Sequence, residues 1–420
     1  MYFPLISHSR QAKRRVSVIA DSDSDSISGL STPTASIDAA SLSLQTPRTP
    51  QPLSSDPPQI PEVVALNFTG YTNAVFYPDW ACNLTPPQQA IPFENVTHIY
   101  YTFIGLNEDG SVFLTEPDTN GNTGSSLLTT KSCVRQLKEG RNKRNSNAKL
   151  LMSVGGGIGS TNFSSVVSHS ESRERLVLNL KNIIDEYSFD GLDVDWESPS
   201  TDTQGYYFLR LMRELRESFK TGEYLLTATY TGASWALETV DISSTVSVVD
   251  QFNLMTYDFY GPWNATSGYH SRLFSTVADS DSASNTMTIC LNNPDVDSRK
   301  LVMGIPLYAQ GFPNVTGPDQ EWSKSEMPES GIQVNYNDLG LHPFDNAIRY
   351  NESQVGASYH NWTENIWYSF DNYDSVLRKT KHVKSHSLGG MFYWQAAGDM
   401  AAATGGSLIS LSASSLGISG

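Results

Sequence analysis

The chain has 420 residues and a formal net charge of −16 at pH 7, with 44 acidic against 28 basic side chains. This length can hold one large α/β domain with an appendage, and the acidic balance argues against nucleic acid or an anionic membrane surface as a partner. The sequence contains no run of ~18 apolar residues, so no segment is predicted to span a membrane.

Residues 1–65 have the composition of a disordered tail. Serine is abundant, Thr-Pro pairs recur, and aromatic residues are almost absent after Phe3. Such a segment has too little apolar surface to order itself. The first residues, MYFPLISHSRQAKRRVSV, place a basic cluster after a very short apolar run. This order is the reverse of a secretory signal peptide and indicates a cytoplasmic chain.

Two further features bear on the compartment. Asn-x-Ser/Thr sequons indicate instead a glycosylated, extracellular protein. Three cysteines allow at most one internal disulfide and leave one over, so they do not decide the matter. We expect an extracellular protein from the sequons and leave the cytoplasmic reading open. The sequons begin at Asn67, Asn83, Asn95, Asn162, Asn264, Asn314, Asn351 and Asn361, and the cysteines are Cys82, Cys133 and Cys290.

Apolar, β-rich runs alternate with amphipathic helical stretches along the rest of the chain. Eight such runs cover 74–80, 98–106, 149–157, 189–197, 224–231, 250–259, 300–309 and 388–396. Between them, stretches such as 176–187 and 207–219 carry apolar residues at helical spacing. Eight strands alternating with helices over this length predict a (β/α)8 TIM barrel, which is an α/β fold.

The domain organisation follows from the same pattern. We predict the barrel in 66–307 and 366–405. The segment 308–365 is too long for a simple helical connection and is rich in Trp and Tyr. It predicts a small α+β insertion that walls one side of a cleft. Residues 406–420 are predicted to be a C-terminal tail.

The run FDGLDVDWE, at 189–197, is the strongest functional signal. On a strand, Asp193, Asp195 and Glu197 share one face, ~6.5–7 Å apart, and the apolar residues share the other. Crowded carboxylates share protons, which raises one pKa and leaves a neutral acid ready to protonate a substrate. One alternative is a solvated acidic edge strand. A Ca²⁺ or Mg²⁺ site is another, ranked below acid catalysis because the spacing lacks loop oxygens and a turn glycine.

Other functional side chains collect where the predicted strands end. Tyr257 and Asp258 end the run 250–259, Tyr308 ends 300–309, and Trp394 stands near the end of 388–396. The carboxyl ends of the strands carry the chemistry in TIM barrels. Aromatic rings around carboxylates favour a sugar site, because pyranose C–H faces stack on rings while hydroxyls bond to acids.

An ordered set of motifs resembles the glycoside hydrolase family 18 chitinases. FDGLDVDWE is similar to that family's D-x-x-D-x-D-x-E signature. SVGG at 153–156 is similar to its strand-three motif S-x-G-G, and MTYDF at 255–259 is similar to its strand-six motif. YTF at 101–103 and LGGMFYW at 388–394 are also similar. The resemblance spans all eight predicted strands and implies a chitinase acting on chitin or chito-oligosaccharides, as a monomer, with no cofactor and no metal.

The resemblance also implies residue roles in a substrate-assisted retaining mechanism. Glu197 is the acid and base, Asp195 orients the 2-acetamido group, Asp193 takes up the proton that Asp195 releases, and Tyr257 bonds the acetamido oxygen. Trp394 is the floor under the reacting sugar. The substrate-binding residues implied are Asp258, Met255, Trp394, Phe103, Tyr77, Trp263, Tyr308, Gly155 and Gly156.

Several positions depart from the family's pattern. Gly157 stands where a tryptophan is usual, Ser198-Pro199 replaces Tyr-Pro, and Gln310 stands in place of an arginine. A family tyrosine falls on Phe76, with Tyr77 one place along. These departures leave the acidic centre intact and predict differently placed neighbouring sugar subsites.

Two other functions remain as alternatives. A chitinase-like lectin would keep the barrel and the cleft and bind without cutting, although such proteins typically lack the terminal glutamate that Glu197 supplies here. An endo-β-N-acetylglucosaminidase acting on N-glycans would suit a cytoplasmic chain. The insertion and Trp394 favour the chitinase.

Overall fold

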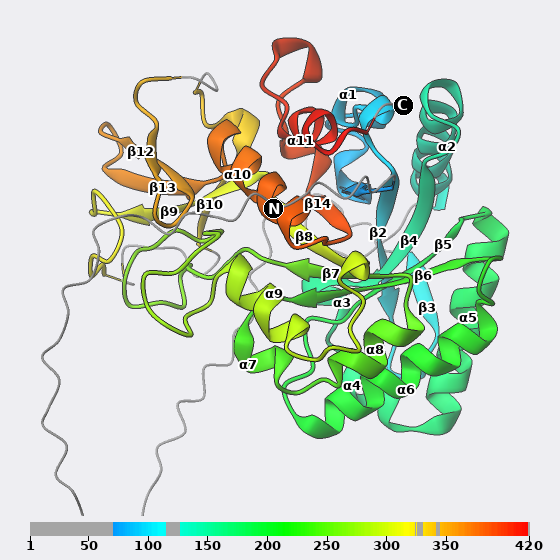
Figure 1. The fold of residues 1–420 in the computed structure, drawn as a ribbon. Coiled ribbons are helices and arrows are strands. Elements are labelled where there is room, and N and C mark those ends of the chain that lie inside the picture. Colours follow the sequence, from blue (N-terminus) through cyan, green and yellow to red (C-terminus); the bar gives the residue numbers. More distant parts are fainter. Residues whose placement is uncertain (1–69, 115–126, 324, 326–330, 342–344, 419–420) are drawn as a thin grey trace, which may run out of the picture. The chain divides into compact units, whose positions relative to one another are not determined.

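The computed structural model describes residues 70–114, 127–323, 325, 331–341 and 345–418. Within these ranges, eight parallel strands close into a barrel surrounded by helices (Figure 1). The ring closes because β1 pairs in parallel with both β14 and β2. The predicted (β/α)8 barrel is confirmed. The disordered tail predicted for 1–65 lies outside the described residues.

Every predicted strand range overlaps one barrel strand, although β1 begins two residues before the predicted range 74–80. The order around the barrel is β1, β14, β8, β7, β6, β5, β4 and β2, and the short strand β3 is added antiparallel to β2. The strands are β1 (Thr72–Pro78), β2 (His98–Leu106), β3 (Val112–Leu114), β4 (Lys149–Gly155), β5 (Gly191–Asp195), β6 (Leu225–Thr231), β7 (Gln251–Met255), β8 (Leu301–Pro306) and β14 (Gly390–Trp394).

Alternate residues of β1 enter different apolar layers. On β1, Val75 and Tyr77 join the large cluster between the barrel and its helices, whereas Ala74 and Phe76 join a smaller cluster that also contains Tyr257. This division is the period-two alternation of strand side chains. It decides which side chains of a strand can reach the mouth of the barrel.

The helices cover the outside of the barrel with apolar stripes. In α6, Thr201 caps the first turn by accepting from the Gln204 amide, and Phe208, Leu211 and Leu215 are buried. The α-helices are α1 (Pro87–Ala90), α2 (Leu127–Arg144), α3 (Gly156–Gly159), α4 (Phe163–Ser168), α5 (Ser170–Tyr187), α6 (Asp202–Ser218), α7 (Ser234–Leu237), α8 (Ile242–Val248), α9 (Ala283–Leu291), α10 (Tyr373–Ser385) and α11 (Leu408–Leu416).

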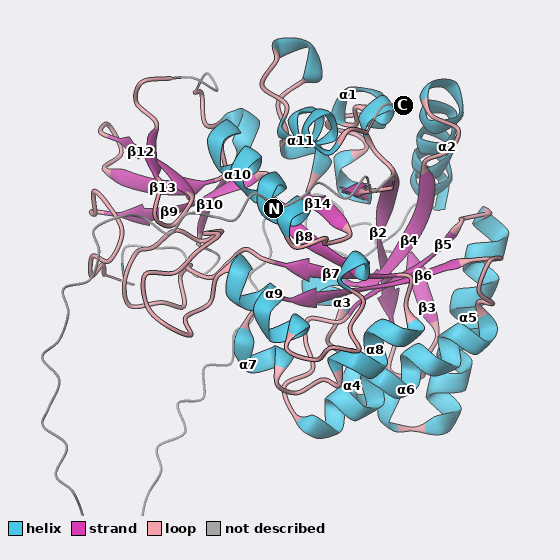
Figure 2. Ribbon diagram, in the orientation of Figure 1, coloured by secondary structure: helices cyan, strands magenta, loops and turns pink. Residues whose placement is uncertain are grey.

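The insertion between β8 and β14 is a second sheet beside the barrel (Figure 2). It has five antiparallel strands in the order β10, β9, β13, β12, β11. The described residues of 308–370 contain short 3₁₀ turns such as Tyr336–Asp338 but no α-helix, which corrects the predicted α+β composition. The strands are β9 (Tyr308–Pro313), β10 (Ile332–Asn335), β11 (Arg349–Asn351), β12 (Gly356–Asn361) and β13 (Ile366–Phe370).

Two predicted boundaries are wrong. The boundary at 365 cuts the insertion, because β13 pairs with both β9 and β12 and belongs to the second sheet. The predicted tail at 406–420 contains α11, whose Leu408, Ile409 and Ala413 are buried. Asn73 of β1 donates to the Ile409 carbonyl at 3.1 Å, which fixes the helix to the barrel.

Cys82 and Cys133 form a disulfide between the segment after β1 and α2, with Cα atoms 6.0 Å apart. Cys290 is free and buried in α9. Three cysteines allow at most one internal disulfide, and the structure has that one with a single cysteine left free. In the described part of the chain, every helix is too short or too polar to cross a bilayer.

A buried ion pair connects the residue after β13 to α10. The Nζ of Lys379 lies 2.6 and 2.7 Å from the Asp371 carboxylate oxygens, and both side chains are 0% exposed. Removing one member of such a pair leaves an uncompensated buried charge. We expect Lys379→Met to lower the free energy of unfolding by about 3 kcal/mol, measured by chemical denaturation.

The exposed pair between Arg299 and Asp297 provides the matched control, since its side chains are 63% and 39% exposed. Arg299→Met should change the free energy of unfolding by less than about 1 kcal/mol. Equal losses in the two variants would show that the Lys379 pair is solvated rather than buried.

Candidate active site

The acidic row lies at the carboxyl end of β5, in the barrel interior. Asp193 and Asp195 are 0% and 3% exposed, and Glu197 follows the strand and is partly exposed. The alternate residue Trp196 packs outward, with its ring 5.4 Å from that of Phe163 on α4. The apolar half of the run therefore anchors β5 to the helices while the acidic half faces the barrel mouth.

Asp193 is held by hydroxyl groups from both neighbouring strands. Its carboxylate accepts from Ser153 of β4 at 2.7 Å, from Thr227 of β6 at 2.5 Å and from Thr229 of β6 at 3.0 Å. Burial raises its pKa to about 6, although the three hydroxyl groups oppose this rise. Asp193 is thus held firmly in place, and its burial brings its pKa closer to neutral pH than that of an ordinary aspartate.

Asp195 has a different environment. Its Oδ1 is buried and has no hydrogen-bond partner in the structure. Burial raises its pKa well above the usual range, and the charges of Glu197 and Asp193 raise it further. The row therefore retains shared protons at a pH where isolated carboxyl groups have lost theirs.

Glu197 stands at the boundary between the buried row and solvent. Burial, and after it the negative charge of Asp258, raises its pKa to about 7. Its backbone amide donates to Ser160 at 2.9 Å, which ties the end of β5 to the segment after β4. A Cβ atom on Gly157 would lie 4.0 Å from Glu197 Oε2. Gly157 therefore leaves open space beside this carboxyl group.

Two tyrosines lie across from the acids. Tyr257, after β7, and Tyr308, which begins β9, have ring centroids 6.2 Å apart. Burial raises the pKa of both hydroxyls well above the usual range, and Asp258 and Glu197 raise both further. Both hydroxyls remain protonated at neutral pH and can donate hydrogen bonds to a ligand.

Asp258 follows Tyr257 with a positive φ of 58°. Its Oδ1 accepts from the Gln310 amide at 2.8 Å and lies 3.4 Å from His270 Nδ1. Gln310 and His270 are functional neighbours that sequence reasoning missed. The sequence marks Gln310 only as a departure from the family's pattern. Its contact with Asp258 is not predictable from local pattern, because the two residues lie 52 positions apart in the sequence.

An aromatic wall flanks the acids. The partly exposed Trp394 stacks on Phe103, with centroids 5.7 Å apart, and also lies near Phe76 and Trp80, at 5.8 and 6.4 Å. Trp80 belongs to a single 3₁₀ turn, Asp79–Ala81, and was not predicted because such a turn has no periodic pattern. The peptide bonds Thr102–Phe103, Glu197–Ser198 and Trp394–Gln395 are cis.

Tyr77 is not part of this arrangement, which corrects its predicted role. It is fully buried in the layer between barrel and helices, and its hydroxyl donates to the Thr85 carbonyl at 2.9 Å. Phe76 points inward instead and stacks on Tyr100 at 4.5 Å. Since neighbouring residues on a strand face opposite ways, only one of the two can reach the site.

The remaining predicted residues lie at the same end of the barrel. Met255 ends β7 and packs against the cluster that contains Tyr257. Trp263 lies in the loop after β7 and is partly exposed. Gly155 ends β4 and Gly156 begins α3, with φ of 115° and 71°. A Cβ on Gly155 would lie 2.1 Å from the Asp195 carbonyl oxygen, so this close approach requires glycine.

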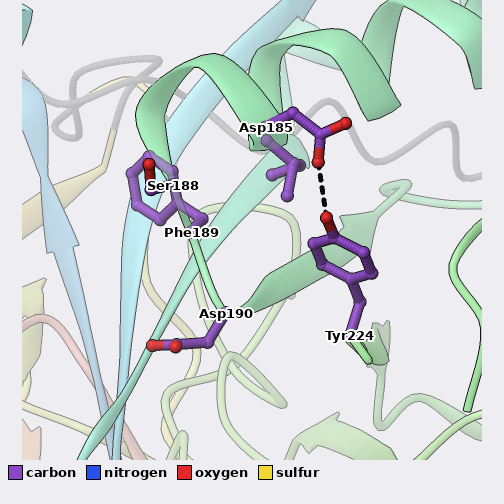
Figure 3. Close-up of a pocket in the computed structure, with 6 residues that line it drawn as sticks. Asp185, Ser188, Phe189, Asp190 and Tyr224 are labelled. Carbon is purple, nitrogen blue, oxygen red and sulfur yellow. Dashed lines mark hydrogen bonds between the residues drawn. The ribbon is translucent and has the colours of Figure 1, made fainter. Parts of the chain in front are cut away.

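A surface hollow lies at the opposite end of β5 (Figure 3). Asp190 immediately precedes β5, whereas the acidic row occupies its carboxyl end. The Tyr224 hydroxyl donates to Asp185 at 2.6 Å across the hollow. The hollow is therefore separate from the acidic row. Its lining consists of Ile184, Asp185, Ser188, Phe189, Asp190 and Tyr224.

The donor set of the acidic row suits proton transfer. In the described ranges, His, Cys, Asp and Glu form no group of three or more that could hold a metal ion. A barrel with stacked carboxylic acids and an aromatic wall at its mouth defines a glycoside hydrolase. The chain matches the family described as "Glycosyl hydrolases family 18" over residues 72–399, and it belongs to that family.

Named relatives agree with this assignment. "Endochitinase 1" of Metarhizium robertsii is 26% identical over 365 residues, which cover 79% of this chain and 82% of that protein. The crystal structure of the Ostrinia furnacalis Group IV chitinase has a TM-score of 0.71 at 25% identity, covering 83% of this chain and 100% of the other.

A third similar protein was solved with a sugar bound. The family 18 chitinase from Cycas revoluta in complex with (GlcNAc)3 has a TM-score of 0.66 at 24% identity. The match covers 81% of this chain and 98% of that chain. At this identity the likeness supports the fold.

Proposed function

We propose that this protein is a chitinase that hydrolyses β-1,4 linkages between N-acetylglucosamine units by a substrate-assisted retaining mechanism. The observation that carries the proposal is the buried row of Asp193, Asp195 and Glu197, with raised pKa values, opposite the Tyr257 hydroxyl. The family and the chitinase relatives support the choice of substrate.

Glu197 supplies the proton in the first step. In its neutral form it protonates the glycosidic oxygen as the bond from that oxygen to the anomeric carbon breaks. The carbonyl oxygen of the sugar's own 2-acetamido group attacks the anomeric carbon and forms an oxazolinium ion. The Glu197 carboxylate then takes a proton from water as the water opens this ion, so two inversions give net retention.

Asp195 and Asp193 control the acetamido group. The Asp195 oxygen that has no partner accepts from the acetamido N–H and stabilises the positive charge on the oxazolinium ring. As Asp195 turns toward the substrate, its proton passes to Asp193, whose raised pKa of about 6 makes it an acceptor near neutral pH. Tyr257 donates to the acetamido oxygen and holds it in line for attack.

The substrate-binding residues surround this centre. Trp394 and Phe103 form an apolar floor for the reacting ring. Asp258 and Tyr308 bond its hydroxyls. Met255, Trp263, Gly155 and Gly156 line adjoining parts of the cleft. We propose chitin or chito-oligosaccharides as the partner, and a monomeric enzyme.

We also propose that the protein is extracellular. The Cys82–Cys133 disulfide supports this, because such bonds persist in oxidising compartments. The sequon at Asn83, next to that disulfide, has an exposed asparagine that a glycosylation enzyme can reach. Mass spectrometry of the protein secreted from a eukaryotic host, before and after glycan removal, tests both features.

Product analysis by the purified full chain tests the function. We expect soluble N-acetylglucosamine oligomers and colloidal chitin to be cleaved, and cello-oligosaccharides of equal length to remain intact, because they lack the acetamido nucleophile. Binding to colloidal chitin without cleavage would indicate a lectin. Cleavage of N-glycans without cleavage of chitin oligomers would indicate an endo-β-N-acetylglucosaminidase.

The pH dependence of kcat/KM follows from Glu197. The mechanism needs its neutral form, which is lost as the pH rises through its pKa of about 7. We therefore expect kcat/KM on a soluble oligomer to fall about tenfold per pH unit above that value. Initial rates between about pH 5 and about pH 9 measure this limb. If kcat/KM instead began to fall near the ordinary pKa of glutamate, the result would contradict the proposed environment of Glu197.

A further inference from the structure

The Asp258 carboxylate is held by the side chains of Gln310 and His270. The Gln310 Nε2 donates to Asp258 Oδ1 at 2.8 Å, and His270 Nδ1 lies 3.4 Å from the same oxygen. The Asp258 side chain is only 11% exposed. Among the described residues, no Lys or Arg forms an ion pair with it. The Gln310 amide thus fixes this carboxylate in place without supplying a positive charge.

The second sheet positions both side chains. Gln310 is 1% exposed on β9, where it pairs with Ser369 of β13. The His270 amide donates to the Ser369 hydroxyl at 3.0 Å, so the same strand pair places His270. The His270 Nε2 is buried without a partner, and a second ring proton would have no acceptor. Through Ser369, β13 thus places the His270 ring beside the same Asp258 oxygen that accepts from Gln310.

We propose that Gln310 is a positioning residue for the reaction: its buried amide holds the Asp258 carboxylate beside Glu197 without bringing a positive charge into the site. This inference rests on the proposed function only for its effect on turnover. A neutral amide orients a carboxylate and leaves its field intact, whereas an ammonium or guanidinium group at the same point would cancel that field.

The surroundings of Glu197 carry no compensating cation that the structure records. Asp195 approaches from β5, Tyr257 and Asp258 from the segment after β7, and Tyr308 from β9. Burial is the first cause of the raised Glu197 pKa, and the Asp258 charge is the second. Gln310 thus preserves the repulsion that keeps Glu197 neutral at higher pH.

Carbon-13 NMR of the whole protein, with labelled glutamate carboxyl groups, tests this without substrate. The Glu197 signal is identified by its loss in Glu197→Gln. We expect Gln310→Lys to lower the Glu197 titration midpoint by about one pH unit, because the new ammonium group offsets the Asp258 charge. Gln310→Met, which is similar in length and uncharged, should leave the midpoint within about 0.3 units.

Gln88→Lys is the matched control. Gln88 is exposed on α1, so this substitution adds the same positive charge outside the site. It should leave both the midpoint and turnover unchanged. If Gln310→Lys folds and its Glu197 titration midpoint equals that of the wild type, the proposal is overturned. If that variant fails to fold, Asp258→Asn replaces it in the NMR arm. An unchanged Glu197 midpoint there would overturn the proposal equally.

Turnover provides the second arm. Gln310→Met should lower kcat/KM on a soluble oligomer about tenfold, with the melting temperature and the pH of the basic limb retained, because Asp258 loses the hydrogen bond from the Gln310 amide. Full activity in this variant would overturn the positioning role. Failure of the wild type to cleave any oligomer would count against the proposed function alone, since the NMR midpoint needs no substrate.

Discussion

Glu197→Gln is expected to lower kcat on soluble N-acetylglucosamine oligomers by at least about a thousand-fold, while the dissociation constant changes by less than about threefold. The amide has the size of the carboxyl group and fills the same space beside Gly157. It carries no acidic proton, so the glycosidic oxygen leaves unprotonated. Single-turnover kinetics and calorimetric binding measure the two quantities separately.

Glu223→Gln is the matched control for this change. Glu223 is exposed just before β6. Its substitution makes the same change from carboxyl to amide at a position outside the barrel mouth. Its kcat should equal that of the wild type within error. If Glu197→Gln kept more than about one tenth of the activity, another group would have to supply the proton, and the assignment of Glu197 as the acid would fail.

Asp195→Asn has the second-largest expected effect. The variant keeps the shape of the side chain but removes the charge that stabilises the oxazolinium ion. We expect kcat to fall by about 10²–10³-fold with little change in KM, because the interaction is made mainly in the transition state. Steady-state rates on a soluble oligomer at several pH values test this.

Asp319→Asn provides the comparison, since Asp319 is exposed in the segment between β9 and β10 and undergoes the same substitution. It should behave as the wild type. A kcat for Asp195→Asn within about tenfold of the wild type would exclude the proposed role of this carboxylate in stabilising charge.

Strand periodicity predicted the barrel and the acidic row because both depend on local pattern. Asp193 and Asp195 alternate with apolar residues, and this alternation alone puts them on one face of β5. The partners Thr227 and Thr229 show the same alternation within β6, so their role beside Asp193 was accessible to the same reasoning.

Long-range features escaped the sequence. The choice between Phe76 and Tyr77 depends on the register of β1 against β2 and β14, which local pattern does not set. The Ser-rich segment that forms α11 reads as a tail until its contact with Asn73 is seen. The role of Gln310 depends on Asp258, which a different element supplies. Each depends on a tertiary contact between distant residues.

Proton NMR of the first product released from an N-acetylglucosamine oligomer tests the central claim most directly. A substrate-assisted reaction forms the β-anomer first, and the α-anomer grows in afterwards by mutarotation. We predict this order for the wild-type protein, with no product from Glu197→Gln over the same interval. The α-anomer appearing first would show direct attack by water and would contradict the mechanism built on Asp195 and the acetamido group.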